Sequence, residues 1–239
     1  MKIVATALLM LAINLVHAQT NAIFDYQIGA EIHRENYNGK GKLESHSIEK
    51  ILRCDTTSEG LLYVMNIRKY SPDGKELWNG EGSLKCDKGV ILIDMESIYH
   101  MEDNGAYQWR TESEYLQIPG IMNDGQTLPD AKVVCTVIKQ PRVKVGPAGS
   151  IHKSDMGAKV IYAIKNRRVS SNKVTTPAGE FSAYKVTSEV TNESDVGYGY
   201  KVESITNEWY VQGVGLVKSE ILNRRGKLLS YSMMTKRTQ

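Results

Sequence analysis

The sequence predicts an all-β protein, built as a single curved antiparallel sheet or incomplete β-barrel. Turn-forming clusters that join Gly to Asn, Asp or Pro recur along the chain, as in NGKG at residue 38, SPDGK at residue 71 and TPAG at residue 176. The segments between these turns alternate apolar and polar residues, a pattern typical of antiparallel strands with one buried face. After the N-terminal segment, helical spacing is weak throughout the chain. Residues 107–116 are the best candidate for a short helix.

The N-terminal segment has the composition of a secretory signal peptide. One Lys precedes an apolar run over residues 3–16, and Val16-His17-Ala18 follows as a small-x-small cleavage signal. The apolar run is shorter than the roughly 20 residues that a membrane-spanning helix needs. We therefore expect cleavage after Ala18 and a mature chain without a transmembrane segment, which is periplasmic or secreted.

The predicted strands carry their apolar side chains on one face. In residues 24–32, FDYQIGAEI, every second position from Phe24 to Ile32 is apolar, and residues 61–67, 91–99 and 184–190 repeat the pattern. The last hairpin would place two stripes against each other, with Val217, Ser219 and Ile221 facing Leu229, Tyr231 and Met233. About ten such strands cannot form one flat open sheet, because the edges would stay exposed. We therefore expect residues 19–239 to form one curved domain.

Two irregular stretches interrupt the strands. Residues 139–157, KQPRVKVGPAGSIHKSDMG, contain two Pro and four Gly and show almost no periodicity. This composition predicts a long loop that could cover the sheet. Residues 115–130 form the second irregular stretch.

The stretch NEWYVQGVGLVKSE at residues 207–220 contains a G-x-G pair. A dinucleotide-binding turn needs a helix after this pair and a third Gly to pack that helix on the strand. Neither is present, and LVKSEIL continues as a strand. We interpret the stretch as strand, corner and strand, with Trp209 and Tyr210 on opposite faces.

Three cysteines follow the signal segment: Cys54, Cys86 and Cys135. An odd number permits at most one internal disulfide. In a sequential meander Cys54 and Cys86 would lie two strands apart, near 10 Å, whereas a disulfide requires Cα atoms within about 7 Å. We therefore expect no Cys54–Cys86 bridge unless the strand order is not sequential.

Charge and motif content exclude several functions. The chain has 30 Lys and Arg against 27 Asp and Glu, a balance that argues against nucleic acid as a partner. Zinc-protease motifs and nucleophile elbows are absent from the sequence. Glu31, His33 and Glu35 share a strand face but are spaced too far apart to converge on one metal ion. Asp94 and Glu96 could serve a glycosidase only if they faced a cleft. We expect a protein that is not an enzyme, with no metal and no cofactor.

The presumed inner face is rich in Tyr and Met, while Phe occurs only twice in the chain. Tyr combines apolar area with a hydroxyl group, and Met adapts its shape to irregular surroundings. A cavity for an amphiphile would suit both, although an ordinary core would have the same pattern. The candidate ligand-binding residues are Tyr26, Tyr63, Met65, Met95, Tyr99, Tyr184, Tyr231 and Met233.

Two C-terminal motifs carry a family resemblance. VTTPAGEFSAYKV at residues 174–186 and EWYVQGVGLVKSE at residues 208–220, in that order, resemble the TapB-like family of exported bacterial envelope proteins of unknown function. CDKGVILIDM at residues 86–95 and YLQIPGIMNDGQTLPDA at residues 115–131 are similar to its earlier segments. The resemblance implies an antiparallel β fold in the envelope, similar to the open barrels of lipoprotein carriers or to lipocalins. It implies no catalytic residue.

These observations lead to a functional hypothesis with two alternatives. The first choice is an exported, non-enzymatic envelope protein that holds an apolar or amphiphilic ligand in its curved sheet. The alternative is an interaction module that binds another envelope protein and has a filled core with no small-molecule ligand. A hydrolase would require His residues or paired acids that converge in a cleft, and this is the third hypothesis.

Overall fold

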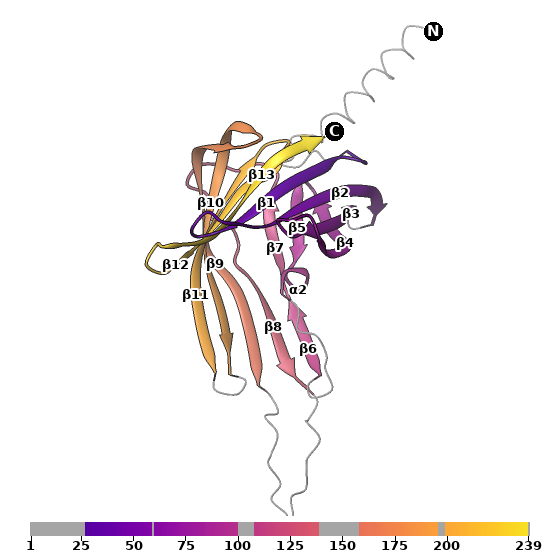
Figure 1. The fold of residues 1–239 in the computed structure, drawn as a ribbon. Helices are drawn as coiled ribbons and strands as arrows, with labels where there is room; N and C mark the ends of the chain where they lie inside the picture. Colours follow the sequence, from indigo (N-terminus) through magenta and orange to yellow (C-terminus); the bar gives the residue numbers. More distant parts are fainter. Residues whose placement is uncertain (1–26, 59, 100–107, 139–157, 196–198, 239) are drawn as a thin grey trace, which may run out of the picture.

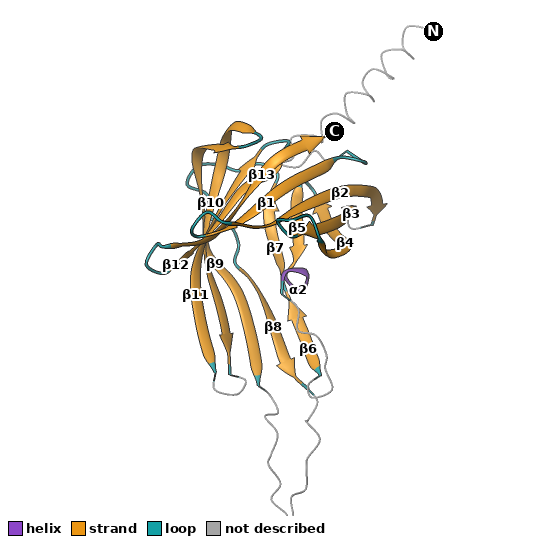
Figure 2. Cartoon of the chain, in the orientation of Figure 1, coloured by secondary structure: helices purple, strands orange, loops and turns teal. Residues whose placement is uncertain are grey.

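The computed structural model describes residues 27–238, except for residues 59, 100–107, 139–157 and 196–198. The predicted signal peptide, Tyr26 and the predicted 139–157 loop lie outside the described residues. The all-β prediction is confirmed, since strands account for nearly all the regular structure (Figure 2). The strands are β1 Glu31–Asn38, β2 Leu43–Thr57, β3 Gly60–Tyr70, β4 Glu76–Asp87, β5 Val90–Asp94, β6 Trp109–Ser113, β7 Tyr115–Pro119, β8 Ala131–Val137, β9 Lys159–Thr176, β10 Gly179–Ser194, β11 Tyr200–Val211, β12 Gly215–Asn223 and β13 Leu228–Thr238.

The described strands form one 13-stranded sheet in the order β6-β8-β9-β10-β11-β12-β13-β1-β2-β3-β4-β5-β7. All the pairings are antiparallel, and β13 joins the C-terminal half of the sheet to β1. The edge strands β6 and β7 are neighbours in sequence, separated by Glu114. The Glu114 amide donates to the Lys132 carbonyl oxygen of β8 at 2.9 Å, and the Met95 amide donates to the Glu114 carbonyl oxygen at 3.1 Å. These contacts bring the two edges together, so the sheet forms a nearly closed barrel.

Two short segments differ from the sequence-based expectation. The described part of the candidate helix, residues 108–116, contributes instead to β6 and β7 and contains no helix. The short helix α2 lies at Met95–Ile98, within a segment expected to continue as a strand. Asp94 caps α2 by accepting a hydrogen bond from the Glu96 amide at 3.0 Å, which ends β5 and starts the helical turn.

The turn predictions hold where the chain is described. TPAG joins β9 to β10 through a two-residue loop, with Thr176 opposite Gly179 and a positive φ of 136° at Gly179. In NEWYVQGVGLVKSE, β11 ends at Val211, Gly213 turns with φ of 73°, and β12 begins at Gly215. The interpretation as strand, corner and strand is confirmed, and no helix follows the glycines.

The core consists of apolar clusters on the concave, inner face of the sheet. The central cluster contains Ile91, Ile118, Met122, Leu128, Val169, Val186 and Tyr210. The α2 cluster contains Met95, Leu116, Ala131, Val133, Cys135, Val160, Ile164 and Val190. Ile93 packs against both, and Leu84 joins the central cluster to a small cluster of Ala30, Ile51 and Met65.

A further cluster shows that the sheet is buried on both faces near the end of β11. Trp209 packs with Val174, Ala183 and Val217, whereas its neighbour Tyr210 belongs to the central cluster. The two aromatic residues therefore point to opposite faces, as the sequence predicted. The face of the sheet that points away from the central cluster is called the outer face below.

The cysteines lie on strands in sequential order. Cys54 on β2 pairs with Tyr63, and Cys86 on β4 pairs with Leu61, so the two thiols are separated by β3. The premise of the sequence argument, a sequential meander, is therefore met. The three cysteines have free thiols in this structure.

Candidate ligand-binding site

Five of the predicted contact residues border the inner-face clusters. Met65 belongs to the small cluster, and Tyr63 packs against it. Met95 is 0% exposed within the α2 cluster, and Tyr99 packs beside it. Tyr184 packs against the central cluster. These five residues are thus distributed over three adjoining clusters rather than gathered around one point.

Tyr231 and Met233 lie on the other face, so the face assignment made from the sequence is wrong for the last hairpin. Met233 lies opposite Lys218, which lies opposite Trp209 on the outer face. Tyr231, two positions away on β13, shares that face. The cause is a β-bulge in the β12–β13 ladder. Leu222 lies opposite Leu228 but Ile221 lies opposite Ser230, so the extra residue Leu229 reverses the alternation before Tyr231 and Met233.

Two open grooves include predicted residues. The larger, of about 650 Å³, is lined by Ser171, Asn172, Lys173, Ser182, Ala183, Tyr184 and Gln212. The smaller, of about 330 Å³, is lined by Asn36, Tyr37, Glu44, Ser45, Lys69, Leu77, Ser219, Ile221, Ser230, Tyr231 and Ser232. Tyr184 connects the larger groove to the central apolar cluster.

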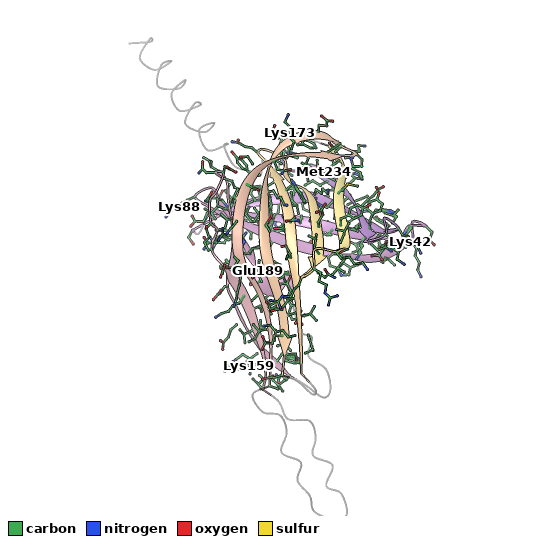
Figure 3. The ribbon with its side chains drawn as sticks, turned by 90° about the vertical axis from the view of Figure 1, so that its left-hand side faces the viewer. Lys42, Lys88, Lys159, Lys173, Glu189 and Met234 are labelled. Atoms are coloured by element: carbon green, nitrogen blue, oxygen red, sulfur yellow. The ribbon has the colours of Figure 1, made fainter. Side chains whose placement is uncertain are left out.

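A second bulge directs an arginine into the interior. The β9–β10 ladder shifts between Thr187 and Glu189, and Asn166 has a positive φ of 53°. Asn166 donates its amide to Asp130 Oδ1 at 3.0 Å and its Nδ2 to Glu189 Oε2 at 2.8 Å. Asn tolerates this left-handed conformation better than most residues. Figure 3 shows Glu189 midway between Lys173 and Lys159, which places the bulge near the middle of β9.

Arg167 follows this bulge and is 0% exposed. Its Nη1 donates to the carbonyl oxygens of Gln117 and Pro129, each at 2.9 Å. Gln117 lies on the edge strand β7, and Pro129 shortly precedes β8 beside the other edge. One guanidinium nitrogen therefore joins β7 to the segment before β8. We call this junction between the two edges of the sheet the seam of the barrel.

The remaining nitrogens of Arg167 are not matched by protein acceptors. Nε and Nη2 are buried and have no hydrogen-bond partner among the described residues, and the same holds for the buried Ser188 Oγ. Buried polar groups in native proteins are nearly always hydrogen-bonded, to protein, water or ligand. These three atoms are thus available to bind a polar group in the interior.

Acidic and phenolic groups accompany Arg167. Glu208 and Tyr210 lie on the inner face of β11, and the Tyr210 hydroxyl donates to Glu208 Oε2 at 3.1 Å. Burial raises the pKa of the Glu208 carboxyl, opposed by the Tyr210 hydrogen bond and the charge of Arg167. Burial likewise lowers the pKa of Arg167 and raises the pKa of Tyr210 well above its ordinary range. We call Arg167, Ser188, Glu208 and Tyr210 the Arg167 layer.

The Arg167 layer lies between two apolar clusters. On β10, Ser188 is flanked by Val186 of the central cluster and Val190 of the α2 cluster. The inner-face residues beside it on β11 and β10, Glu208, Thr206 and Asn192, are only partly buried. Since Glu208 is both desolvated and partly accessible, the inner face offers a polar layer that small molecules can approach.

Sequence reasoning missed Arg167. KNRR at residues 165–168 resembles an exposed basic run, and its members Lys165 and Arg168 are indeed exposed. The available signal was an Asn followed by two Arg in the middle of an alternating strand. Asn permits the left-handed bulge that turns one of the two arginines inward.

The residues considered from the sequence for metal binding or glycoside hydrolysis make structural contacts. His33 Nε2 lies 3.6 Å from Glu31, which also accepts a bond from Lys50 at 3.0 Å. Asp94 serves as the cap of α2. In the parts of the chain that the structure describes, there is no group of three or more His, Cys, Asp or Glu suited to a metal ion. Nor does any helix in those parts have the length and hydropathy needed to cross a bilayer.

Comparisons with known proteins agree with this architecture. A Bacteroides fragilis protein, assigned as exported and with a YmcC-like fold, is 20% identical, with a TM-score of 0.65 over 91% of this chain and 99% of that chain. A protein from Parabacteroides distasonis, assigned as a lipoprotein, is 21% identical, with a TM-score of 0.65 over 91% and 98% of the two chains. At these identities the likeness shows the fold alone.

No curated protein matches the sequence significantly. The resemblance to TapB-like proteins is not confirmed by these comparisons and remains an expectation from the C-terminal motifs. The model of the DUF3108-like family, in contrast, matches residues 27–234, nearly the whole of the described barrel. The chain therefore belongs to the DUF3108-like family.

Proposed function

We propose that this chain is an exported, non-enzymatic binding protein of the bacterial envelope. It holds an apolar or amphiphilic ligand against the inner face of its curved sheet. The TapB-like resemblance and the assignments of the two similar structures as an exported protein and a lipoprotein support the location. The signal-peptide pattern in residues 1–18 supports it independently.

The observation that carries the binding proposal is the composition of the inner face. Apolar clusters that include Met65 and Met95 alternate with a polar layer in which Arg167 Nε and Nη2 and Ser188 Oγ are buried without a hydrogen-bond partner among the described residues. A core that served stability alone would satisfy these donors or replace them with apolar groups. The partial exposure of Glu208 indicates how a ligand reaches this layer.

The test uses a fluorescent fatty-acid analogue, whose emission increases in an apolar environment, titrated into the purified protein. Tyr184→Ala removes an inner-face residue that lines the larger groove. Tyr231→Ala is the matched control, because Tyr231 is also partly buried but lies on the outer face. We expect Tyr184→Ala to weaken binding several-fold and Tyr231→Ala to leave it unchanged.

A lack of probe binding by the wild-type protein, combined with ligand-free protein in native mass spectrometry after purification from the host, would contradict the proposal. Weakening by Tyr231→Ala alone would move the ligand to the smaller groove.

The interaction module stays the second candidate because of one surface feature. Leu77 and Trp78 are adjacent on β4 and remain 54% and 48% exposed. Exposed large apolar side chains at neighbouring positions are common at protein-binding surfaces. A specific complex that forms in the envelope and is lost in Trp78→Ser would favour this function, particularly if the inner face binds no probe.

A further inference from the structure

We propose that the Arg167 layer is the head-group site for an amphiphile bearing a single carboxylate. The ligand's hydrocarbon chain would lie along the α2 cluster. This inference rests on the proposed function, and it adds the chemical class of the ligand and the residue that selects it.

The donor geometry of Arg167 favours a carboxylate. Its Nη1 is occupied by the carbonyl oxygens of Gln117 and Pro129. The two nitrogens without described partners, Nε and Nη2, form one edge of the planar guanidinium. That edge presents two parallel N–H groups, which match the two oxygens of a carboxylate. Ser188 Oγ, also buried and without a described partner, supplies another donor.

The charge of the layer favours an anion. Arg167 is fully buried, and no acidic side chain among the described residues lies within ion-pair distance of it. An uncompensated buried cation is costly. The carboxyls of Glu208 and Asp130 are near enough to interact with the charge. Their hydrogen bonds, however, come from the Tyr210 hydroxyl and the Asn166 amide and not from Arg167. A ligand carboxylate on the free guanidinium edge would complete the coordination of the buried charge.

The same surroundings favour one negative charge over two. Glu208 and Tyr210 lie close to Arg167 and affect its pKa, so a dianionic phosphate head would meet a carboxyl group at short range. The layer also offers one guanidinium edge and one hydroxyl group, which is few donors for the oxygens of a phosphate monoester. A monocarboxylate therefore suits the site best.

The direction of the hydrocarbon chain follows from the clusters on either side. Toward the α2 cluster, Val190 and Met95 are themselves buried, and Tyr99 stacks on Tyr162 with ring centroids 5.1 Å apart. The inner face of β10 and β11 is partly exposed in this direction, at Asn192 and Ser204. Toward the central cluster, Val186 and Tyr210 are almost fully buried. The chain thus has access on the α2 side.

The first experiment compares head groups on the unaltered protein. Dodecanoic acid, dodecanol and dodecyl phosphate are titrated at pH 8, below their aggregation concentrations, in competition with the fluorescent analogue. At this pH the carboxylic acid is ionised. We expect the acid to bind about 10- to 100-fold more tightly than the alcohol, the range given by hydrogen bonds to a charged group, and more tightly than the phosphate.

The second experiment assigns this preference to Arg167. Arg167→Met should reduce the acid-to-alcohol preference to near unity. Arg168→Met is the matched control, since Arg168 is adjacent but exposed, and it should retain the preference. Ser188→Ala removes one donor without touching the seam, and should reduce the preference about 3- to 10-fold. If Arg167→Met does not fold, the Ser188→Ala variant still tests the head-group site.

The possible outcomes separate the two proposals. Equal binding of acid and alcohol, or an acid preference that survives both Arg167→Met and Ser188→Ala, would overturn the head-group site and leave the binding function intact. Tighter binding of dodecyl phosphate would overturn the choice of a carboxylate. If none of the three amphiphiles binds, the proposed function fails, and the head-group site fails with it.

Discussion

At the scale of single residues, the carboxyl of Glu208 links stability to pH. Burial holds its pKa above the ordinary value of 4.5 in the folded protein. The folded state therefore binds more protons than the unfolded state above that pH, and the contribution of Glu208 to the free energy of unfolding decreases as pH rises. We expect Glu208→Gln, which cannot ionise, to gain stability relative to the wild type between pH 4 and pH 8.

The measurement is urea denaturation of both proteins at several pH values across this range. Glu193→Gln provides the control, because Glu193 lies on the neighbouring strand and is exposed. A difference between Glu208→Gln and wild type that stays constant, or that moves toward the wild type at higher pH, would show that Arg167 and Tyr210 outweigh the burial of the carboxyl.

The sequence predicted residues such as Met65 and Met95 at the inner face because alternation is a local property. It could not identify Arg167, since burial of a guanidinium depends on acceptors distant in sequence. Those acceptors, the carbonyl oxygens of Gln117 and Pro129, precede Arg167 by 50 and 38 residues. Charge in a sequence normally indicates exposure, and only the folded barrel shows the exception.

At the scale of elements, bulges determine which residues face the interior. The one at Leu229, in the β12–β13 ladder, places Tyr231 and Met233 on the outer face, and the one at Asn166 turns Arg167 inward. Turn residues indicate hairpins in the sequence, as TPAG does, because Gly and Pro have special backbone preferences. A bulge inserts one residue with at most a weak marker, such as the single Asn at position 166. The alternation counted from the sequence is therefore shifted by one residue after it.

The bulge at Asn166 yields a prediction for the β9–β10 element. Asn166 has φ of 53° and an exposed side chain, so a substitution there tests the backbone more than the packing. Asn166→Val should lower the free energy of unfolding by about 1–2 kcal/mol, because a β-branched residue is strained in the left-handed region. Asn166→Gly should cost about half of this or less, since Gly adopts positive φ freely.

Chemical denaturation of the two variants gives the comparison. The Gly variant is the control for losing the hydrogen bond from Asn166 Nδ2 to Glu189, because both substitutions remove it. Equal losses in the two variants would mean that this side-chain bond, and not the left-handed backbone, determines stability at the bulge.

At the scale of the whole molecule, closure of the barrel depends on contacts that join distant parts of the chain. The repeated hairpins predicted one curved sheet, and the structure has one. The manner of closure was not predictable, because β6 and β7 are consecutive in sequence but occupy opposite ends of the strand order. Their meeting at Glu114 and the bonds of Arg167 across the seam arise only when the entire sheet has curled.

The position of β13 gives the last prediction. This strand pairs with β12 on one side and β1 on the other, and so joins the two halves of the sheet. A chain that ends at residue 227 would leave two exposed strand edges and would remove Met234, a buried member of the cluster that contains Trp209. We expect it to lose cooperative unfolding in urea, as followed by circular dichroism. A chain that ends at residue 235 keeps β13 paired from Leu228 through Met234, and should unfold in a single transition. If the shorter chain also unfolds in one sharp transition near the midpoint of the full protein, then the half with β1 to β5 and β7 and the half with β6 and β8 to β12 are stable without the strand that connects them. The sheet would then not fold as one unit.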